Sequence, residues 1–335
     1  MTDPSRHDQE QIDAVITWVD GQDPAHQTLR QAYIAKAAVP LQENAVNPHR
    51  WADNDEILYC LRSIEINAPW IRRIWIVTDG KMPDLSDLSG DLRRKVGHVL
   101  HADLFEGFAD ALPTFNSLAI ESLIWRIPDL TERFIYLNDD FFLTKPLSVD
   151  NLFVDQAPVL RGRWDDFSAL ENAPGKRDDP TLFYRFIQIN AARCLGFPAT
   201  RLFHTAHVAH PMLRSVMAKL YDRFPDAFHA TIGARFRNSD QVLPQGLHNH
   251  ACIAESRAVL SVADDHLHIK SGFGAQFSAD EMRAFLTEAM HPDIRFLCVN
   301  DLPQLEAVLP EARDWLMRSI GAEVHEGALQ GSSPG

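Results

Sequence analysis

The chain has 335 residues, of which 45% are hydrophobic and 23% are charged. This composition is ordinary for a globular protein and excludes a disordered, collagen-like or coiled-coil chain. Its 32 basic and 46 acidic side chains give a net charge of −14. Because phosphate backbones and anionic lipids repel such an excess, we expect neither nucleic acid nor a membrane surface as the main partner.

The cysteines and the N-terminus bear on the cellular compartment. The four cysteines are far apart and include no CxxC pair, which favours reduced, mostly buried thiols. The first residues, MTDPSRHDQEQ, lack the basic and apolar regions of a signal peptide, and no apolar stretch is long enough to cross a membrane. We therefore expect a cytoplasmic chain without an integral membrane segment, disordered at residues 1–11 and in the tail 321–335.

Strand and helix patterns alternate in the first half of the chain. Helices are predicted at about Pro24–Ala38, from Asp53 to Ile66, and at Asn116–Arg126, between β-branched runs that predict strands at Ile12–Val19, Ile71–Thr78, Gly97–His101 and Arg133–Asn138. This alternation predicts an α/β fold with a doubly wound, mainly parallel sheet. Ligands of such sheets bind at the carboxyl ends of the strands. Three predicted strands end there in acidic residues, at Asp20, Asp79 and Asp139-Asp140.

The second half of the chain is more helical. Its predicted strands are His266–Lys270 and Ile294–Val299, and its predicted helices are Thr181–Leu195, Pro211–Arg223, Asp240–Ala254, Ala279–Met290 and a last helix to about Ile320. No linker divides the chain clearly in two. We therefore expect a single domain over residues 12–320.

The segment FIYLNDDFFL carries the strongest local signal. Asp139 and Asp140 directly follow a buried strand, where two carboxylates need a counter-charge. One interpretation is a helix cap in a solvated turn. The other is a site for Mg²⁺, which binds a few carboxylate oxygens together with substrate phosphates.

Histidines and arginines offer further candidates. Histidines occur at His204, His207 and His210, at His248 and His250, and at His266 and His268. A zinc site is disfavoured, because there is no HExxH motif and Pro211 ends the first group. A single histidine that acts as acid, base or phosphate donor is the favoured interpretation. In RFRNSDQ, Arg235 and Arg237 could grip a diphosphate or form an ordinary ion pair at a helix end.

Taken together and in order, these segments resemble the conserved regions of the Stealth family of sugar-1-phosphate transferases. The regions lie at about 12–24, 50–153, 204–254 and 294–320, and the segments that carry the resemblance are IDAVITWVDGQDP, RWADNDEILYCLRSIEINAPWIRRIWIVTDG, LPTFNSLAIES, FIYLNDDFF, the stretch from His210-Pro211 to RFRNSDQ, and FLCVND. The family includes bacterial capsular-polysaccharide phosphotransferases and the α/β subunit of the lysosomal-enzyme N-acetylglucosamine-1-phosphotransferase. The large insertions of the animal enzyme are missing, which argues against a lysosomal-enzyme acceptor.

The resemblance implies a glycosyltransferase-A-like, Rossmann-like fold and assigns roles to particular residues. The catalytic residues that it implies are Asp140, His210 and Arg237. The cofactor is Mg²⁺ or Mn²⁺, with Asp139, Asp140, Asn300 and Asp301 as its ligands. The donor-binding residues are Trp18, Asp20, Gly21, Asn54, Asp55, Asp79, Asn116, Ser117 and Asn138.

The implied reaction moves N-acetylhexosamine-1-phosphate or hexose-1-phosphate from a UDP-sugar to a carbohydrate hydroxyl, with release of UMP, in capsule or exopolysaccharide synthesis. Either Asp140 or His210 would take the hydroxyl proton. One alternative is a conventional glycosyltransferase that releases UDP, and another is an inactive sugar-binding or scaffold protein. Peripheral association with capsule-synthesis machinery and homo-oligomerisation are both compatible with this reading, and the acceptor is left open.

Overall fold

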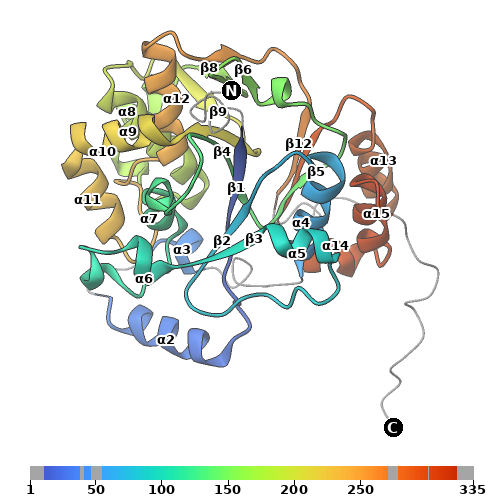
Figure 1. The fold of residues 1–335 in the computed structure, drawn as a ribbon. Coiled ribbons are helices and arrows are strands. Elements are labelled where there is room, and N and C mark those ends of the chain that lie inside the picture. The colour runs from blue at the N-terminus through green and yellow to red at the C-terminus, as the bar shows by residue number, and fades with distance from the viewer. Residues whose placement is uncertain (1–10, 38–40, 47–54, 271–277, 301, 323–335) are drawn as a thin grey trace, which may run out of the picture.

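A computed structural model describes residues 11–37, 41–46, 55–270, 278–300 and 302–322 of the chain. Figure 1 shows the arrangement of its elements. The helices are α2 (Pro24–Ala35), α3 (Glu43–Val46), α4 (Glu56–Asn67), α5 (Gly90–Lys95), α6 (His101–Leu104), α7 (Ser117–Glu121), α8 (Ser168–Glu171), α9 (Phe183–Cys194), α10 (Arg214–Arg223), α11 (Pro225–Gly233), α12 (Pro244–Ala254), α13 (Ala279–Ala289), α14 (Leu302–Val308) and α15 (Ala312–Ser319). The strands are β1 (Ile12–Thr17), β2 (Ile74–Thr78), β3 (Val96–Leu100), β4 (Arg133–Asn138), β5 (Phe141–Leu143), β6 (Phe153–Val154), β7 (Ala157–Leu160), β8 (Gly162–Asp165), β9 (Leu202–Thr205), β10 (His210–Leu213), β11 (Val259–Leu260), β12 (His266–Ile269) and β13 (Phe296–Val299).

The centre of the molecule is a five-stranded sheet in the order β10-β4-β1-β2-β3. Strands β3, β2, β1 and β4 are parallel, and β10 lies antiparallel to β4 at one edge. Every residue of β1 and β2 is buried, as expected for parallel strands that are covered on both faces. The predicted α/β fold with a mainly parallel sheet is confirmed.

The parallel pairing brings the polar ends of three strands to one edge of the sheet. Thr17 of β1 is paired with Val77 of β2 and with Asn138 of β4. The residues that follow these strands, among them Asp20, Asp79 and Asp139, therefore leave the sheet on the same side. This is the edge at which α/β sheets bind ligands.

A smaller sheet, in the order β12-β13-β5, continues from this edge. After β4 the chain turns at Asp139-Asp140 and enters β5, which pairs antiparallel with β13. On its other side β13 pairs in parallel with β12. Segments about 160 residues apart in the sequence thus meet beside Asp140, where the backbone N–H of Val299 donates to the Asp140 carbonyl oxygen at 3.1 Å.

Helices flank the central sheet on two sides (Figure 1). The helices α8–α12 gather on the side of β4, whereas α13 and α15 lie beside the smaller sheet. The strands β8 and β9 form a separate two-stranded sheet, and β9 packs against α9 and α12. This sheet, which was not predicted, adds a wall beside the central sheet. A buried ion pair anchors this wall, because Arg161, just before β8, binds Asp265, just before β12, through two hydrogen bonds of 2.8 Å.

Several predicted elements differ from the structure. Residues 210–213, predicted to open a helix, instead form β10, and the helix α10 begins at Arg214. The proline at 211 is tolerated because β10 is an edge strand, where a missing N–H leaves no ladder bond unmade. The helix predicted at Asn116–Arg126 ends at Glu121, a separate helix α11 follows α10, and the last predicted helix is divided into α14 and α15.

Candidate active site

A cavity of about 1010 Å³ lies between the central sheet, the helices α7 and α9, and the β8–β9 wall. Four of the residues predicted for the site, Asn138, His210, Arg237 and Asn300, line it. The other polar side chains of its wall include Glu121, Tyr136, Arg163, Tyr184, His204, His207, Gln245, Asp264, His266, His268 and Lys270. Residues between Leu118 and Asn300, far apart in the sequence, therefore line one cavity.

Arg237 provides the central positive charge of the cavity. It lies between α11 and α12, and its Nη2 atom donates to the Ser117 Oγ atom at 2.5 Å. Burial lowers the pKa of Arg237, and the nearby Glu121, Tyr136, Asp140 and Tyr184 act in the opposite direction. An arginine keeps its charge in a protein, so the cavity holds a fixed cation enclosed by acidic and phenolic groups.

Glu121 was not among the residues predicted for the site. It is the last residue of α7 and buried, and the Gln245 side-chain amide donates to its Oε2 atom at 2.8 Å. Burial and this carboxylate raise the pKa of the adjacent Tyr136 well above its usual value. Glu121 lies four residues after Ser117, and this helical spacing was the signal that could have placed both on one face.

His210 lies at the first position of β10, opposite Tyr136 of β4, and the two rings stack with centroids 6.4 Å apart. Burial lowers its pKa to about 3, with a smaller effect of His248 in the same direction. The imidazole is therefore neutral at physiological pH and keeps a nitrogen lone pair. The helix predicted at Pro211–Arg223 would place His210 directly before a helix, but His210 instead lies in the edge strand β10.

The turn at Asp139-Asp140 carries the predicted cation ligands. Burial, and after it these two carboxylates, raise the pKa of the neighbouring Cys298 and Cys60 thiols, which marks the turn as a local concentration of negative charge. Paired carboxylates are the donors that Mg²⁺ or Mn²⁺ prefers, so the turn fits the cation that the family resemblance implies. Asp301 lies outside the described residues.

Asn300 connects Asp140 to a histidine. Its side-chain amide nitrogen donates to the Asp140 carboxylate, and its amide oxygen accepts a hydrogen bond from His268 Nε2 at 2.6 Å. In this orientation Asn300 positions both neighbours. Its expected role as a cation ligand stays a prediction.

The predicted donor-binding residues are spread along the same edge of the sheet. Lys81 donates to the Asp20 carboxylate at 2.5 Å and lowers the pKa of Asp20. Burial raises the pKa of Asp79. Asn116 accepts from the Leu118 N–H at 3.2 Å and so caps α7. Neither Asp20 nor Asp79 lines the cavity, and the buried Trp18 and the adjacent Gly21 likewise lie outside its wall.

Two other predicted donor residues are not part of the described cavity wall. Asp55 lies at the start of α4 and is exposed, with an Arg313 nitrogen 3.9 Å from its carboxylate. Asn54 lies outside the described residues.

The remaining histidines divide into structural and cavity-facing groups. On α12, His248 accepts a hydrogen bond from the backbone N–H of Leu213 in β10 at 2.9 Å, and His250 accepts one from the backbone N–H of Phe203 in β9 at 3.1 Å. Both histidines therefore have a structural role. His204 lines the cavity but is paired with Asp165 at 2.7 Å. In contrast, His207 and His268 meet at Cys298, and ligand atoms of the three side chains lie within 4.8 Å of one another.

Comparison with known proteins identifies three conserved regions in this chain. Family models described as Stealth protein conserved regions 1, 2 and 3 match residues 10–37, 50–159 and 206–250. These are the first three regions named from the sequence, in the expected order. The fourth, at about 294–320, stays a prediction.

Three curated relatives illustrate the similarity. The chain is 35% identical over 256 residues to an exopolysaccharide phosphotransferase of Streptomyces coelicolor, which covers 75% of this chain and 41% of that protein. It is 31% identical over 298 residues to the exopolysaccharide phosphotransferase CpsY of Mycobacterium leprae, with 87% and 51% covered. It is also 31% identical over 259 residues to the capsular polysaccharide phosphotransferase SacB of Neisseria meningitidis serogroup A, with 75% and 44% covered. The chain thus spans about half the length of these relatives or less.

Solved structures give a more distant likeness. A complex of the galactosyltransferase LgtC with donor and acceptor sugar analogues aligns with a TM-score of 0.45 and 12% identity, over 94% of this chain and 98% of that one. Mouse xyloside xylosyltransferase 1 aligns with a TM-score of 0.41 and 12% identity, over 87% and 98%. Among the described residues, no helix has the length and apolar character needed to span a membrane. The ordered match of three conserved regions, together with the curated relatives, shows that the chain belongs to the Stealth family.

Proposed function

We propose that this chain transfers a sugar-1-phosphate from a UDP-sugar to a carbohydrate hydroxyl and releases UMP. The group transferred is N-acetylhexosamine-1-phosphate or hexose-1-phosphate, and the product is a phosphodiester in a capsule or exopolysaccharide. The observation that supports this proposal most directly is the meeting of Arg237, His210 and Asn138 on one cavity wall, in a Stealth chain whose relatives are named polysaccharide phosphotransferases.

The reaction breaks one bond of the diphosphate. The acceptor oxygen attacks the β-phosphorus, the bond from that phosphorus to the bridging oxygen breaks, and UMP leaves with this oxygen. The bond between the sugar and its phosphate survives. Such transfers depend on positioning and on stabilisation of the charge that develops on the phosphoryl oxygens, which Arg237 supplies as a fixed cation.

His210 is the base that we favour for the acceptor proton. Its neutral imidazole faces the cavity, whereas Asp140 is hydrogen-bonded to Asn300 and its carboxylate suits a cation. The low pKa of His210 reflects burial without a neighbouring anion. A bound diphosphate would raise that pKa and make proton transfer to His210 more favourable.

Asp139 and Asp140 would hold the Mg²⁺ or Mn²⁺ ion, together with Asn300 and Asp301 as predicted. When bound, the ion would offset the negative charge of the donor diphosphate. Donor contacts by Trp18, Asp20, Gly21, Asn54, Asp55, Asp79, Asn116 and Ser117 belong to the same proposal. So do a cytoplasmic location and a peripheral association with capsule-synthesis machinery.

Product analysis tests the reaction. The protein is incubated with UDP-N-acetylglucosamine, Mg²⁺ or Mn²⁺ and an oligosaccharide acceptor, and the released nucleotide is separated by chromatography. We expect UMP in equal amounts to the phosphodiester, loss of turnover with EDTA, and its return when the cation is added back. Release of UDP without UMP would instead identify a conventional glycosyltransferase, and full turnover in EDTA would remove the cation from the proposal.

A further inference from the structure

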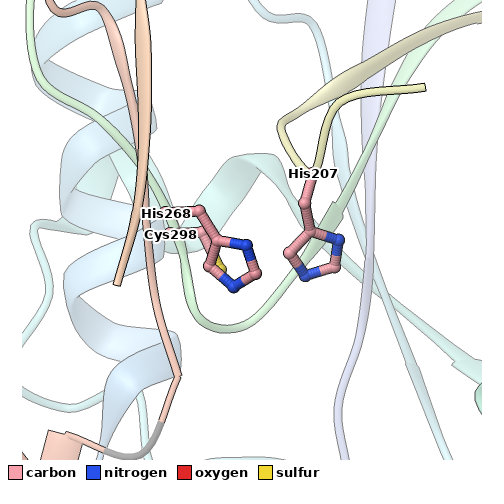
Figure 2. Close-up of side chains that lie close together, drawn as sticks. All are labelled: His207, His268 and Cys298. Carbon is pink, nitrogen blue, oxygen red and sulfur yellow. The ribbon is translucent and has the colours of Figure 1, made fainter. Parts of the chain in front are cut away.

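Two imidazoles and a thiol from three separate segments meet at the cavity. His207 lies between β9 and β10, His268 on β12, and Cys298 on β13. One nitrogen of each imidazole and the Cys298 sulfur lie within 4.8 Å of one another, and the two imidazole centroids are 4.6 Å apart. Figure 2 shows the rings side by side with the sulfur behind His268. Nitrogen and sulfur donors are gathered here beside the turn, because Asn300 donates both to the Cys298 sulfur at 3.4 Å and to the Asp140 carboxylate.

The backbone fixes this arrangement. In the parallel pair of β12 and β13, His268 is the direct register partner of Cys298, so the two side chains lie next to each other on one face of the sheet. Cys298 is also paired with Phe141 of β5, and the Phe141 ring makes an edge contact with His207 at a centroid distance of 4.7 Å. All three donors therefore rest on one three-stranded sheet.

A hydrogen bond orients one of the imidazoles. His268 Nε2 lies 2.6 Å from the Asn300 amide oxygen, which can only accept, so Nε2 carries the proton and Nδ1 keeps its lone pair. Histidines that bind metals usually donate their second ring nitrogen to an acceptor in this way. Because both imidazoles line the cavity, an ion between them would be reached from the cavity.

A reactive thiol is a poorer interpretation of the same cluster. Cys298 is fully buried. Reactive cysteines have lowered pKa values in electropositive, partly exposed surroundings. Coordination of a cation is the chemistry that would make a thiolate stable at this position.

We propose that His207, His268 and Cys298 bind a divalent cation of the zinc class, Zn²⁺ or Co²⁺, with a fourth position open to the cavity. Two imidazoles and a thiolate are donors for such ions, and three protein ligands with one open position is the pattern of catalytic zinc sites. Tetrahedral bonds of about 2.0 Å to nitrogen and 2.3 Å to sulfur place ligand atoms about 3.5 Å apart, so shifts of roughly 1 Å close the site. Mg²⁺ prefers oxygen donors, so this site differs in its donor atoms from the neighbouring carboxylates of Asp139 and Asp140.

Cobalt spectroscopy tests the site without any need for turnover. Protein freed of metals with a chelator is titrated with Co²⁺, and we expect a thiolate-to-cobalt absorption band that saturates at one thiolate-bound ion per chain and that added Zn²⁺ removes. Cys298→Ser should abolish the band. His207→Gln and His268→Gln should each weaken Co²⁺ binding by roughly tenfold or more, because one of three ligands is lost.

Cys60→Ser is the matched control. Cys60 is also a buried thiol near Asp139 and Asp140, but it contacts the Asn138 carbonyl oxygen on the α4 side, so this variant should keep the band. The proposal is overturned if Co²⁺ does not bind, if it binds without a thiolate band, or if Cys298→Ser and both histidine variants bind it like the parent. If Cys298→Ser does not fold, Co²⁺ binding by His207→Gln decides the test, because His207 is only half-buried and its replacement should be tolerated. UMP release with Mg²⁺ is measured separately, so failure here leaves the proposed reaction standing.

Discussion

At the scale of single residues, Arg237 is the side chain whose surroundings are most specific. Ser117 accepts a hydrogen bond from its guanidinium, while Glu121 and Asp140 lie close enough to affect its pKa. These contacts hold the planar group in a fixed position before any substrate binds. Preorganised charge of this kind stabilises a transition state more than a mobile charge does.

We expect Arg237→Lys to lower kcat by roughly a hundredfold or more, because lysine lacks the planar fork that binds two oxygens at once. The control is Arg235→Lys, two residues away. Arg235 donates to the carbonyl oxygens of Asp110 at 2.6 Å and Leu112 at 3.0 Å, and is not part of the cavity wall. Steady-state kinetics and thermal midpoints of both variants check this. If Arg237→Lys and Arg235→Lys lowered kcat equally, Arg237 would contribute to the folded structure and not to transition-state stabilisation.

His210 makes a second prediction at this scale. If it takes the acceptor proton, His210→Gln should lower kcat about 100-fold or more, while a side chain of similar size limits damage to the buried β10 edge. His204→Gln is the comparison, because His204 lines the same cavity but is bound to Asp165. We expect less than about a tenfold loss there. Near-normal turnover of His210→Gln would transfer the role of base to Asp140.

At the scale of elements, β10 and the smaller sheet build the site. The strand β10 was not predicted, and β12 and β13 were predicted as strands but not as partners in one sheet. Pro211 suggested the first turn of a helix, since proline is common there. The structure instead uses it in an edge strand, because tertiary pairing with β4 overrides the local signal. His268 and Cys298 were equally hidden. Each occurs in a predicted strand, but only the β12–β13 register, which no local pattern encodes, joins them.

Gly162 at the start of β8 gives a test of the cavity wall. Its φ is +153°, and an added Cβ atom would lie 2.3 Å from the His204 carbonyl oxygen on β9. Gly162→Ala should therefore destabilise the protein by about 1–3 kcal/mol through backbone strain, and the clash should add to this. Gly175→Ala, where nothing lies within 4 Å, is the control and should leave stability nearly unchanged. Thermal midpoints that shift equally would show that β8 adapts.

At the scale of the whole molecule, the sequence was informative where the pattern is local and repeated. The four parallel strands, with their carboxyl ends at one edge, follow from β-branched runs that end in polar turns. The Gln245–Glu121 hydrogen bond and the His207–Cys298 contact depend on segments that fold back over long distances. Buried polar contacts of this kind leave no period in the sequence, so they could not be predicted.

Because many histidines are buried, the stability of the whole fold should depend on pH in the acidic range. Burial lowers the pKa of His101 and His248 to about 4 and that of His210 to about 3. It also lowers the pKa of His26, His204, His250, His266 and His268. In the unfolded chain each would titrate near pH 6.5. Below that pH the unfolded state binds protons that the native state does not, so stability is complete above about pH 6.5 and is lost as the pH falls.

The expected loss is large. A single histidine with a strongly lowered pKa contributes up to about 1.4 kcal/mol per pH unit between its two pKa values, and His101, His210 and His248 act together. Asp79, whose pKa burial raises, opposes this only weakly as one group. We expect the urea midpoint to fall steeply from pH 7 to pH 5. His248→Gln should flatten this dependence, because its amide oxygen can replace the acceptor for the Leu213 N–H without titrating. A urea midpoint that stays constant from pH 7 to pH 5 would mean that these histidines gain protons without unfolding the protein.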